Sequence, residues 1–497
     1  MSFAVTYTRC HRGLDTPLIR VEIHLSNGIP SFSMVGLPET AVKESKERIR
    51  SALMNSQFDF PCRRITVNLA PADVPKQGTH FDLAIAIGIL IASDQLKTNK
   101  DIAQFEFAAE VALSGELRPT HALLPLAYAC KQAKHILVIT TDNAPEATLI
   151  QSLCIYGLTH LLEVVALLQG KETAPALPKK PPHKPLQLLD FADINGHQFA
   201  KRALKVAAAG RHNVLMTGPP GTGKTMLASR LPSILPPLTE QQAIELACIA
   251  SLRGQVNLWQ HFYQRPFRHP HHTASAVALV GGGSHPKPGE ISLAHHGVLF
   301  LDELPEFQRS VLETLREPLE SGQISIARAN QQVTFPAAFQ LIAAMNPCPC
   351  GYATSKLKAC RCSTQKIQQY QHKLSGPFLD RIDIHLKIAE LPTDKILARA
   401  VDNESSRTIQ TSVIAAQARQ LKRQGKLNAL LNNQEVQTNC ALTTKQQHLM
   451  TQAIDKWRLS ARTIYRILKV TRTLADLAQC DRIGDSHLME AIQFKGF

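Results

Sequence analysis

The sequence predicts an α/β protein made of two different folded parts and a helical C-terminal region. Short apolar segments with strand-like spacing alternate with segments of helical spacing along most of the chain. The stretch 171–187 is rich in proline and lysine, and a linker is expected there because proline lacks the amide hydrogen that helices and sheets require. A glycine-rich loop, Gly218–Thr225, stands between an apolar segment and a helical one. These observations predict domains over 1–170 and 188–390 and a mostly helical region over 391–497.

The N-terminal part has the alternation of an α/β or α+β domain. Leu18–Leu25 and Arg64–Leu69 have the two-residue period of strands, and Ile136–Ile139 is apolar enough for a buried strand. Glu39–Met54 has helical spacing with many charges, whereas Phe81–Ser93 is apolar on every side and predicts a buried helix. Strands and helices therefore mix in this domain.

The composition is that of a globular protein with a basic surface. Of the 497 residues, 44% are hydrophobic, and no apolar run reaches the roughly 18 residues that a membrane helix needs. The 55 Lys and Arg exceed the 40 Asp and Glu, which gives a formal charge of +15. Such a charge favours polyanions, nucleic acid first, although it also occurs as plain solvated surface. Because no signal peptide is evident, the 11 cysteines indicate reduced thiols in the cytoplasm.

The glycine-rich loop is a complete Walker A motif. Its glycines let backbone amides point at phosphate oxygens, and the helix that follows adds its positive dipole end. Lys224 is expected to bind the β- and γ-phosphates of ATP, and the Thr225 hydroxyl is placed for Mg²⁺. The residues expected to hold the triphosphate are Gly218, Pro219, Pro220, Gly221, Thr222, Gly223, Lys224, Thr225 and Met226.

Two later strands supply the rest of a hydrolytic site. Gly297–Leu301 predicts a central strand that carries Asp302 at its end, where it would bind Mg²⁺, followed by Glu303 as general base for the attacking water. Phe339–Met345 predicts a further strand that ends at Asn346, whose amide would hold that water. An asparagine before a proline is also common in plain turns.

Two arginines are candidates for a site shared between subunits. Arg381 follows a Ser-Gly-Pro turn and is placed to reach an ATP on a neighbouring subunit, although a salt bridge to Asp380 or Asp383 is the alternative. Arg462 opens a C-terminal helix and is placed to sense the γ-phosphate. We prefer it to the other cations of that helix, some of which are expected to be surface charge.

Four cysteines form a possible metal site within the insertion 348–362. Cys348, Cys350, Cys360 and Cys362 have the spacing C-x-C-x₉-C-x-C, and four converging thiolates predict a structural Zn²⁺. The alternative is a loop of free thiols, since pairs two residues apart are less usual than C-x₂-C.

Two predicted hairpins are suited to touch DNA rather than to build the core. One is the glycine-rich segment Gly281–Gly289, which contains His285 and Lys287; the other spans Gln323–Phe335 and carries Arg328 near its tip. The histidines of 269–272 lack an evident acidic partner, so packing or loop contacts are expected there rather than a metal.

These segments together resemble the magnesium-chelatase-like AAA+ proteins of the YifB/ComM family. The resemblance runs nearly the whole length of the chain, and its motifs are highly specific. Besides Walker A, they are H-P-H-H (His269–His272), G-G-G-S (Gly281–Ser284), L-F-L-D-E-L-P-E-F (Leu299–Phe307), N-P-C-P-C-G (Asn346–Gly351), S-G-P-F-L-D-R-I-D (Ser375–Asp383) and R-T-L-A-D-L (Arg472–Leu477).

The resemblance implies a P-loop AAA+ domain with a helical lid, preceded by an α+β, ChlI-type N-terminal domain similar to Lon protease and ribosomal S5. It also implies a homo-hexameric ring with Arg381 as the arginine finger and Arg462 as the sensor arginine. ComM-like members are ATP-driven DNA helicases that migrate branches and extend the integration of incoming DNA in natural transformation. The alternative is a magnesium-chelatase-type ATPase subunit that remodels a partner enzyme for metal insertion.

The sequence departs from a Lon-type protease at the nucleophile. No serine lies near Gly78–Asp82, and Lys76 without a nucleophile is no catalytic dyad. The N-terminal domain is therefore expected to be non-proteolytic and to serve DNA binding or assembly.

Overall fold

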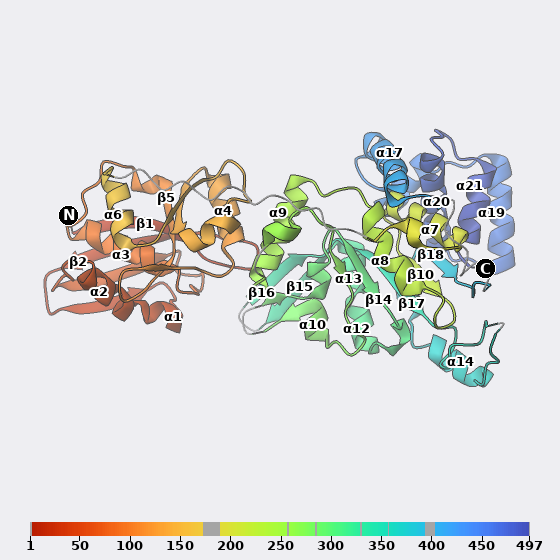
Figure 1. Cartoon of the computed structure of the whole chain (residues 1–497), viewed down its shortest axis with the longest axis horizontal. Helices are drawn as coiled ribbons and strands as arrows, with labels where there is room; N and C mark the ends of the chain where they lie inside the picture. The colour runs from red at the N-terminus through yellow and green to blue at the C-terminus, as the bar shows by residue number, and fades with distance from the viewer. Residues whose placement is uncertain are drawn as a thin grey trace. The chain divides into compact units, whose positions relative to one another are not determined.

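The computed structural model describes residues 2–171, 189–255, 258–283, 286–328, 331–355, 357–392 and 403–496. The chain divides into two compact units (Figure 1). Unit 1 comprises 1–185 and 240–262, and unit 2 comprises 186–239 and 263–497. The predicted linker 171–187 lies almost wholly outside the described residues.

Unit 1 contains two sheets and a short hairpin. The larger sheet has the order β1-β2-β4-β3, in which only β3 and β4 run parallel. The smaller sheet, β5-β8-β9, is parallel throughout, and β6 pairs with β7. The strands are β1 (Phe3–Arg9), β2 (Leu18–Ser26), β3 (Ser31–Val35), β4 (Arg64–Ala70), β5 (Phe105–Ala108), β6 (Glu110–Val111), β7 (Leu117–Arg118), β8 (Ile136–Thr140) and β9 (Cys154–Leu158).

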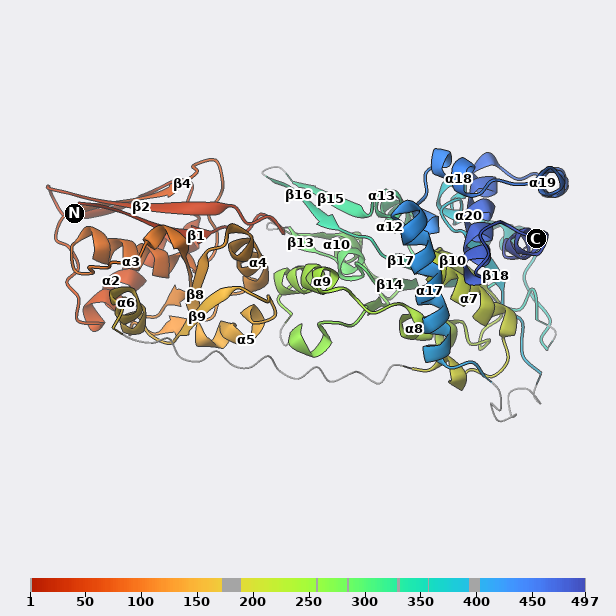
Figure 2. The ribbon, with the colours of Figure 1, turned by 90° about the horizontal axis from the view of Figure 1, so that it is seen from above.

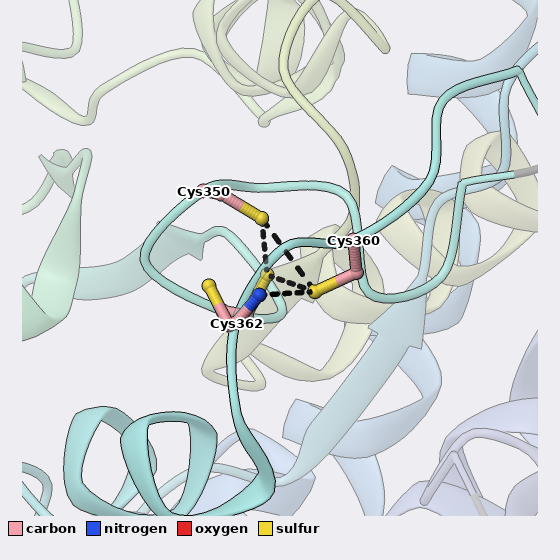
Figure 3. Close-up of side chains that lie close together, drawn as sticks. Cys350, Cys360 and Cys362 are labelled. Carbon is pink, nitrogen blue, oxygen red and sulfur yellow. Dashed lines mark hydrogen bonds between the residues drawn. The ribbon is translucent and has the colours of Figure 1, made fainter.

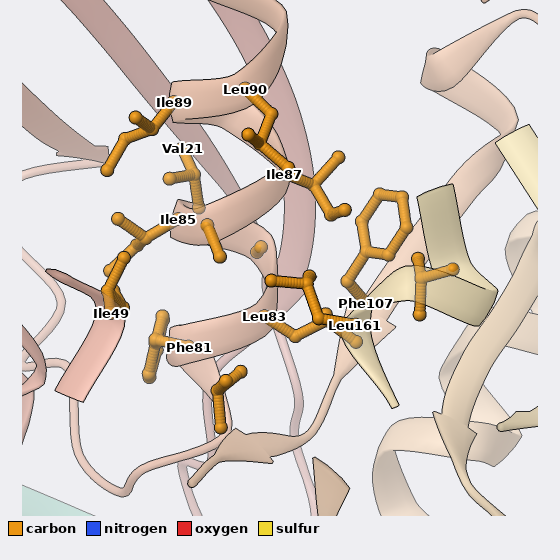
Figure 4. Close-up of a cluster of buried hydrophobic side chains, with 14 of the residues drawn as sticks. Val21, Ile49, Phe81, Leu83, Ile85, Ile87, Ile89, Leu90, Phe107 and Leu161 are labelled. Carbon is orange, nitrogen blue, oxygen red and sulfur yellow. The ribbon is translucent and has the colours of Figure 1, made fainter. Parts of the chain in front are cut away.

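A buried helix, α3 (Phe81–Ala92), forms the centre of unit 1. It packs against β1, β2 and β5, and its side chains are apolar on all sides, as its sequence predicts, except for buried Asp82, which pairs with Arg48. Figure 4 shows Leu83, Ile87 and Phe107 among the side chains of this cluster, with Leu161 of a neighbouring helix. Burial of this apolar surface is the main stabilising contribution to the unit.

The other helices of unit 1 surround these sheets. They are α1 (Thr40–Lys43), α2 (Ser45–Asn55), α4 (Leu123–Ala133), α5 (Ala144–Ala147), α6 (Leu161–Gln169) and α9 (Glu240–Leu252). The segment predicted as one helix over 39–54 is two helices, α1 and α2, which meet at Glu44. Helix α9 packs on α4 although 107 residues separate their ends, and Ser251 Oγ donates to Glu146 Oε1 at 2.6 Å.

Unit 2 is built on a five-stranded sheet in which every pair is parallel. The order is β11-β14-β17-β10-β18, so the strand before the Walker A loop lies between two strands that come later in the chain. The strands are β10 (Val214–Thr217), β11 (Phe267–Arg268), β14 (Val298–Leu301), β17 (Gln340–Met345) and β18 (Ile384–Lys387). Two hairpins join this sheet's elements: β12 (Gly281–Gly282) with β13 (Lys287–Pro288), and β15 (Gln323–Arg328) with β16 (Gln331–Pro336).

Helices cover this sheet and form the C-terminal region. Helix α17 crosses α7 and α8 (Figure 2), where Gln410 and Gln420 donate to the carbonyls of Leu235 and Ala209. The helices are α7 (Gln198–Gly210), α8 (Lys224–Ile234), α10 (Ala276–Val280), α11 (Glu290–Leu293), α12 (Arg309–Thr314), α13 (Arg316–Ser321), α14 (Thr364–Gln371), α15 (Gly376–Leu379), α17 (Ser406–Gln424), α18 (Asn433–Asn439), α19 (Thr444–Trp457), α20 (Ala461–Leu477) and α21 (Asp485–Gln493). Among the described residues, no helix is long and apolar enough to cross a membrane.

Replacing Leu161 by Ala is expected to lower the free energy of unfolding by about 3 kcal/mol, because a fully buried leucine leaves a cavity in the core. The matched control is Leu162→Ala one residue later, where the side chain is 47% exposed and a change within about 0.5 kcal/mol is expected. Urea unfolding of both variants measures the difference. Equal losses at the two positions would contradict the assignment of α6 faces.

Candidate nucleotide site

The Walker A loop joins the end of β10 to the start of α8. Gly223 has φ +79°, a conformation that favours glycine, and it immediately precedes the first residue of the helix, Lys224. The side chain of Lys224 is buried, and its Nζ donates to the carbonyls of Gly218 at 2.8 Å and Pro219 at 2.9 Å. Burial lowers the pKa of this ammonium, so an anionic ligand in the loop would favour its charged form.

A hydroxyl and a carboxylate meet at the mouth of the loop. Thr225 Oγ1 donates to Asp302 Oδ2 at 2.7 Å, although the two residues are 77 positions apart in the chain. Asp302 directly follows β14, and β14 is separated from β10 only by β17. Hydroxyl and carboxylate oxygens are ligands that Mg²⁺ prefers, so this pair fits the metal of a Mg-ATP complex.

Asn346 completes the same edge of the sheet. It directly follows β17, the strand between β10 and β14, and its Oδ1 accepts from Lys224 Nζ at 3.2 Å. The three predicted polar groups of Lys224, Asp302 and Asn346 thus lie together at the carboxyl ends of neighbouring parallel strands, where α/β proteins bind their ligands.

Glu303 is next to this cluster and has a partner that sequence reasoning missed. Its backbone is left-handed, with φ +52°, and its amide donates to Asp302 Oδ1 at 2.9 Å. Its carboxylate contacts His272 Nδ1 at 2.9 Å. The expectation that the histidines of 269–272 lack an acidic partner is therefore wrong for His272, because the partner is 31 residues away in sequence. His269 instead packs its ring on Phe300, with 4.7 Å between centroids.

The four cysteines of the 348–362 insertion converge (Figure 3). The Sγ atom of Cys348 lies 3.3 Å from that of Cys350 and 3.7 Å from that of Cys360, and all four sulfurs lie within 4.8 Å of one another. Four sulfurs bonded at ~2.3 Å to one tetrahedral Zn²⁺ would lie ~3.8 Å apart, so the donor set fits zinc. All eleven cysteines are free of disulfides.

The cysteine loop packs directly on the Walker A loop. Gly351 has φ +86°, and a Cβ atom there would lie 2.7 Å from the ring carbons of Pro220. Because Cys348 is only two residues after Asn346, the same loop also anchors the residue that contacts Lys224. The geometry of the insertion and that of the nucleotide site are therefore coupled.

Comparisons with known proteins agree with this site. The chain matches the family models "Subunit ChlI of Mg-chelatase" over residues 21–143, "Magnesium chelatase, subunit ChlI" over 190–396 and "Magnesium chelatase, subunit ChlI C-terminal" over 403–495. It is 50% identical over 500 aligned residues to the competence protein ComM of Haemophilus influenzae, covering 100% of this chain and 98% of that protein. It is 46% identical to YifB of Escherichia coli, covering 100% of this chain and 97% of that protein.

The chain belongs to the magnesium chelatase-like ComM/YifB family. This family is of the AAA+ ATPase type, which implies ATP and Mg²⁺ as ligands of the cluster around Lys224. A more distant relative is the DNA replication licensing factor Mcm6 of Drosophila melanogaster, 26% identical over 218 residues, which are 41% of this chain and 25% of that protein.

The two arginine candidates of this family member lie away from its Walker A loop. Arg381 is buried, and its guanidinium pairs with Glu320 and donates to the carbonyl of Pro377. Neither Asp380 nor Asp383, the partners considered from sequence, takes that guanidinium. Arg462 is 67% exposed at the side chain and approaches Asp380 at 3.9 Å. Within the described residues, neither arginine bonds to the loop around Lys224.

Some of the other cations of α20 were expected to be surface charges, but Arg472 and Lys469 contact other parts of the protein. Arg472 is buried and donates to Asp476, and Lys469 donates to the carbonyl of Ala429 at 3.0 Å. Of the DNA-contact candidates, Lys287 is exposed on β13 and Arg328 ends β15, whereas His285 lies outside the described residues.

Asp383 ties the loop that carries Arg381 to two other elements. Its buried carboxylate accepts from the amide of Asn213, just before β10, at 3.0 Å and from Arg466 of α20 at 2.5 Å. The carbonyl of Arg381 accepts from Asn213 Nδ2 at 3.0 Å and from Arg466 at 3.3 Å. Burial by itself would raise the pKa of Asp383, but Arg466 and His212 hold it well below its usual range.

Replacing Asp383 by Asn is expected to destabilise the protein by about 3 kcal/mol at pH 7, because it leaves Arg466 facing no charge in a buried site. A carboxyl whose folded pKa is depressed stabilises above its unfolded pKa, near 3.9, and loses that contribution as pH falls. The difference in free energy of unfolding between wild type and variant should therefore stay constant from neutral pH down to about 5. It should narrow below about pH 4.

Urea unfolding at several pH values measures this gap. The control is Asp481→Asn, which removes an equally charged partner of Arg419 from a side chain that is 95% exposed, and should change stability by less than about 1 kcal/mol. A gap that widens on acidification would contradict the ion-paired state of Asp383.

Proposed function

We propose that this protein is an ATP-hydrolysing DNA motor that works as a hexameric ring. ATP hydrolysis as its energy source is supported by one observation, the cluster of Lys224, Thr225, Asp302 and Asn346 at one sheet edge. Support for DNA as the partner comes from the full-length relative named competence protein ComM and from the partial match to Mcm6, a DNA replication factor. By this analogy the motor unwinds and migrates branched DNA during recombination and the integration of incoming DNA in natural transformation.

The proposed chemistry is the attack of water on the γ-phosphorus of ATP. When bound, Mg-ATP would supply the anhydride bond, and its metal would neutralise negative charge on the phosphates. The loop from Gly218 to Thr225, with Met226, would hold the triphosphate, and Thr225 and Asp302 would bind the metal. Asn346 would hold the water while Glu303 takes its proton; the new P–O bond forms as the bond to the bridging oxygen breaks, releasing ADP and phosphate.

Ring assembly gives the two arginines their proposed roles. A finger contributed by Arg381 would neutralise transition-state charge on the ATP of the neighbouring subunit, and Arg462 would report on the γ-phosphate. The exposure of Arg462 suits contact with another chain. For Arg381 the role requires that the guanidinium leave Glu320, whose own side chain is 62% exposed.

DNA contacts are assigned to the two hairpins of unit 2. Lys287, His285 and Arg328 are the residues proposed to touch the strand in the pore, and the formal charge of +15 supports a polyanionic partner. We retain the sequence-based division at 1–170, 171–187, 188–390 and 391–497, with a non-proteolytic N-terminal domain, and note that residues 240–262 of the third segment fold with unit 1. Eleven free thiols suit a reducing compartment, and we place the motor in the cytoplasm.

A second candidate function is favoured by one specific observation. The three matching family models are all named for subunit ChlI of magnesium chelatase. In that alternative the same ATPase remodels a partner enzyme during metal insertion, and the nucleotide site would be identical. Recovery of a large chelatase subunit with the protein, in the absence of any response to DNA, would favour this alternative over the motor.

The motor predicts that single-stranded or branched DNA stimulates ATP hydrolysis and that Glu303→Gln abolishes turnover. Loss of a general base slows hydrolysis about 100-fold or more, while ATP binding persists because Lys224 and Asp302 are untouched. A coupled ADP-release assay with and without branched DNA measures turnover, and strand displacement measures the motor.

The matched control for this test is Glu306→Gln. That side chain is 44% exposed and pairs with Lys373, so hydrolysis should change less than about twofold. ATPase activity indifferent to every form of DNA would overturn the motor, and unwinding by Glu303→Gln would overturn the assignment of the base.

We further propose that the four-cysteine cluster holds one structural Zn²⁺. Metal analysis of purified protein should find about one zinc per chain, because four thiolates form a closed tetrahedral site. Removal of the metal should also weaken ATP binding, since Gly351 packs on Pro220 of the Walker A loop. Absence of zinc together with four titratable thiols would refute the assignment. The control is Cys62→Ser, at an exposed cysteine outside the cluster, which should leave the zinc content unchanged.

A further inference from the structure

A basic cleft lies in unit 1, in the α+β domain rather than in the ATPase unit. It has a volume of about 540 Å³, within the ~300–1,000 Å³ range of ligand sites. Its walls come from β3, from α2 and from the segment 56–63 that leads into β4. The lining residues central to its chemistry are Phe32, Lys46, Arg50, Phe58, Phe60 and Arg63.

The cleft follows from the position of β3 at the edge of its sheet. The order β1-β2-β4-β3 leaves one side of β3 without a strand partner among the described residues. Helix α2 presents Lys46, Arg50 and Met54 to the cleft, and residues four apart share one face of a helix. Met54 is 56% exposed, so this helical face is open to an incoming ligand rather than closed against the core.

Aromatic rings form part of the lining. The rings of Phe32 and Phe60 are stacked, with centroids 6.4 Å apart and planes inclined by 23°. The guanidinium of Arg50 lies over the Phe60 ring at 5.7 Å. Phe32, Phe58 and Phe60 are only partly buried, so they pack on the core from one side and keep ring surface toward the cleft.

The charges of the cleft are mostly unneutralised. Lys46, Arg50 and Arg63 face a single lining carboxylate, Asp59. Arg50 and Arg63 are exposed and form no ion pair within the described part of the chain, and Lys46 pairs only with Glu47 at the solvent, at 3.5 Å. Two exposed arginines without carboxylate partners beside aromatic rings offer sites for phosphates next to sites for bases.

A second hollow extends this surface. It has a volume of about 500 Å³ and shares Asp59, Pro61 and Arg63 with the cleft. Its lining also contains a second carboxylate, Asp94, and the side chains of Ser93 and Gln95, which are hydrogen-bonded to each other and, through Gln95, to the backbone of Asp59. The two hollows meet at Arg63, so a ligand longer than one nucleotide has a continuous surface along which to lie.

We propose that this cleft binds a short segment of single-stranded nucleic acid, with bases against Phe32, Phe58 and Phe60 and phosphates on Lys46, Arg50 and Arg63. Positively charged grooves with aromatic platforms bind single strands without reading their sequence, because every base has a stacking face. The site goes beyond the proposed motor, since it lies in the other unit and requires neither ATP nor the hairpins of unit 2. It provides the chain with a nucleic-acid contact that does not depend on the nucleotide cycle.

The test is binding of fluorescent oligothymidine and oligouridine of about 12 nucleotides to the full chain without nucleotide, over a range of salt concentrations. The double variant Arg50→Gln/Arg63→Gln should weaken binding and reduce the slope of log affinity against log salt by about 1.4, which corresponds to two phosphate contacts on a single strand. Phe60→Leu keeps an apolar side chain but removes the stacking face, and should weaken binding about tenfold.

The control removes two equal charges elsewhere in unit 1. Lys43→Gln/Arg118→Gln changes two exposed cations that do not line the cleft and should leave the salt slope unchanged. Photocrosslinking of iodinated oligothymidine, followed by peptide mapping, should identify residues between 32 and 63. The thymidine and uridine arms show which nucleic acid binds better.

The proposal is overturned if the cleft variant and the control bind alike, or if all crosslinks fall in unit 2. Crosslinks in the cleft without DNA-stimulated hydrolysis would support this site and reject the motor. Stimulated hydrolysis together with normal DNA binding by the cleft variant would support the motor and reject this site. Thermal unfolding of each variant shows whether a loss of binding arises from unfolding. A loss in the cleft variant at unchanged melting temperature supports the site.

Discussion

The parallel pairing of β10, β17 and β14 is the constraint on which the nucleotide site depends. In a parallel sheet the carboxyl ends of neighbouring strands lie at one edge, so whatever follows each strand is brought together there. Here these followers are the Walker A loop, Asn346 and Asp302, and the bonds from Thr225 to Asp302 and from Lys224 to Asn346 are the result. The fully buried apolar residues of the three strands hold that register.

Around this edge, buried polar contacts connect elements that are far apart in the chain. Asp383 and the carbonyl of Arg381 receive hydrogen bonds from Asn213 before β10 and from Arg466 of α20. The same loop therefore contacts the start of the central strand and a helix of the C-terminal region. A displacement of α20 cannot leave the loop of Arg381 unchanged unless these bonds break, and buried charged groups make such breakage costly.

The sequence predicts the features that depend on local spacing. Walker A, the strand before Asp302, the apolar helix α3 and the hairpin β15–β16 are each identifiable because neighbouring residues determine them. Features made by distant residues were missed: the contact of His272 with Glu303 joins a loop to a strand end, and no local pattern marks it. The contact of Arg466 with Asp383 is likewise not marked by any local pattern, since the two residues are 83 positions apart. The helix break at Glu44 lies within a continuous helical pattern and had no glycine or proline to signal it.

The packing of α9 changes how the chain as a whole is understood. Residues 240–262 belong to unit 1 although they stand between α8 and β11 of unit 2, so the polypeptide passes between the units three times. The proline-rich stretch is then not the boundary at which the protein can be cut in two: a fragment that ends there lacks α9 and uncovers the surface of α4 that α9 covers. The chain instead leaves unit 2 shortly after α8, contributes α9 to unit 1, and returns to unit 2 before β11. Unit 1 can therefore be complete only when the stretch of chain that forms the ATPase unit is also present, because α9 lies within that stretch.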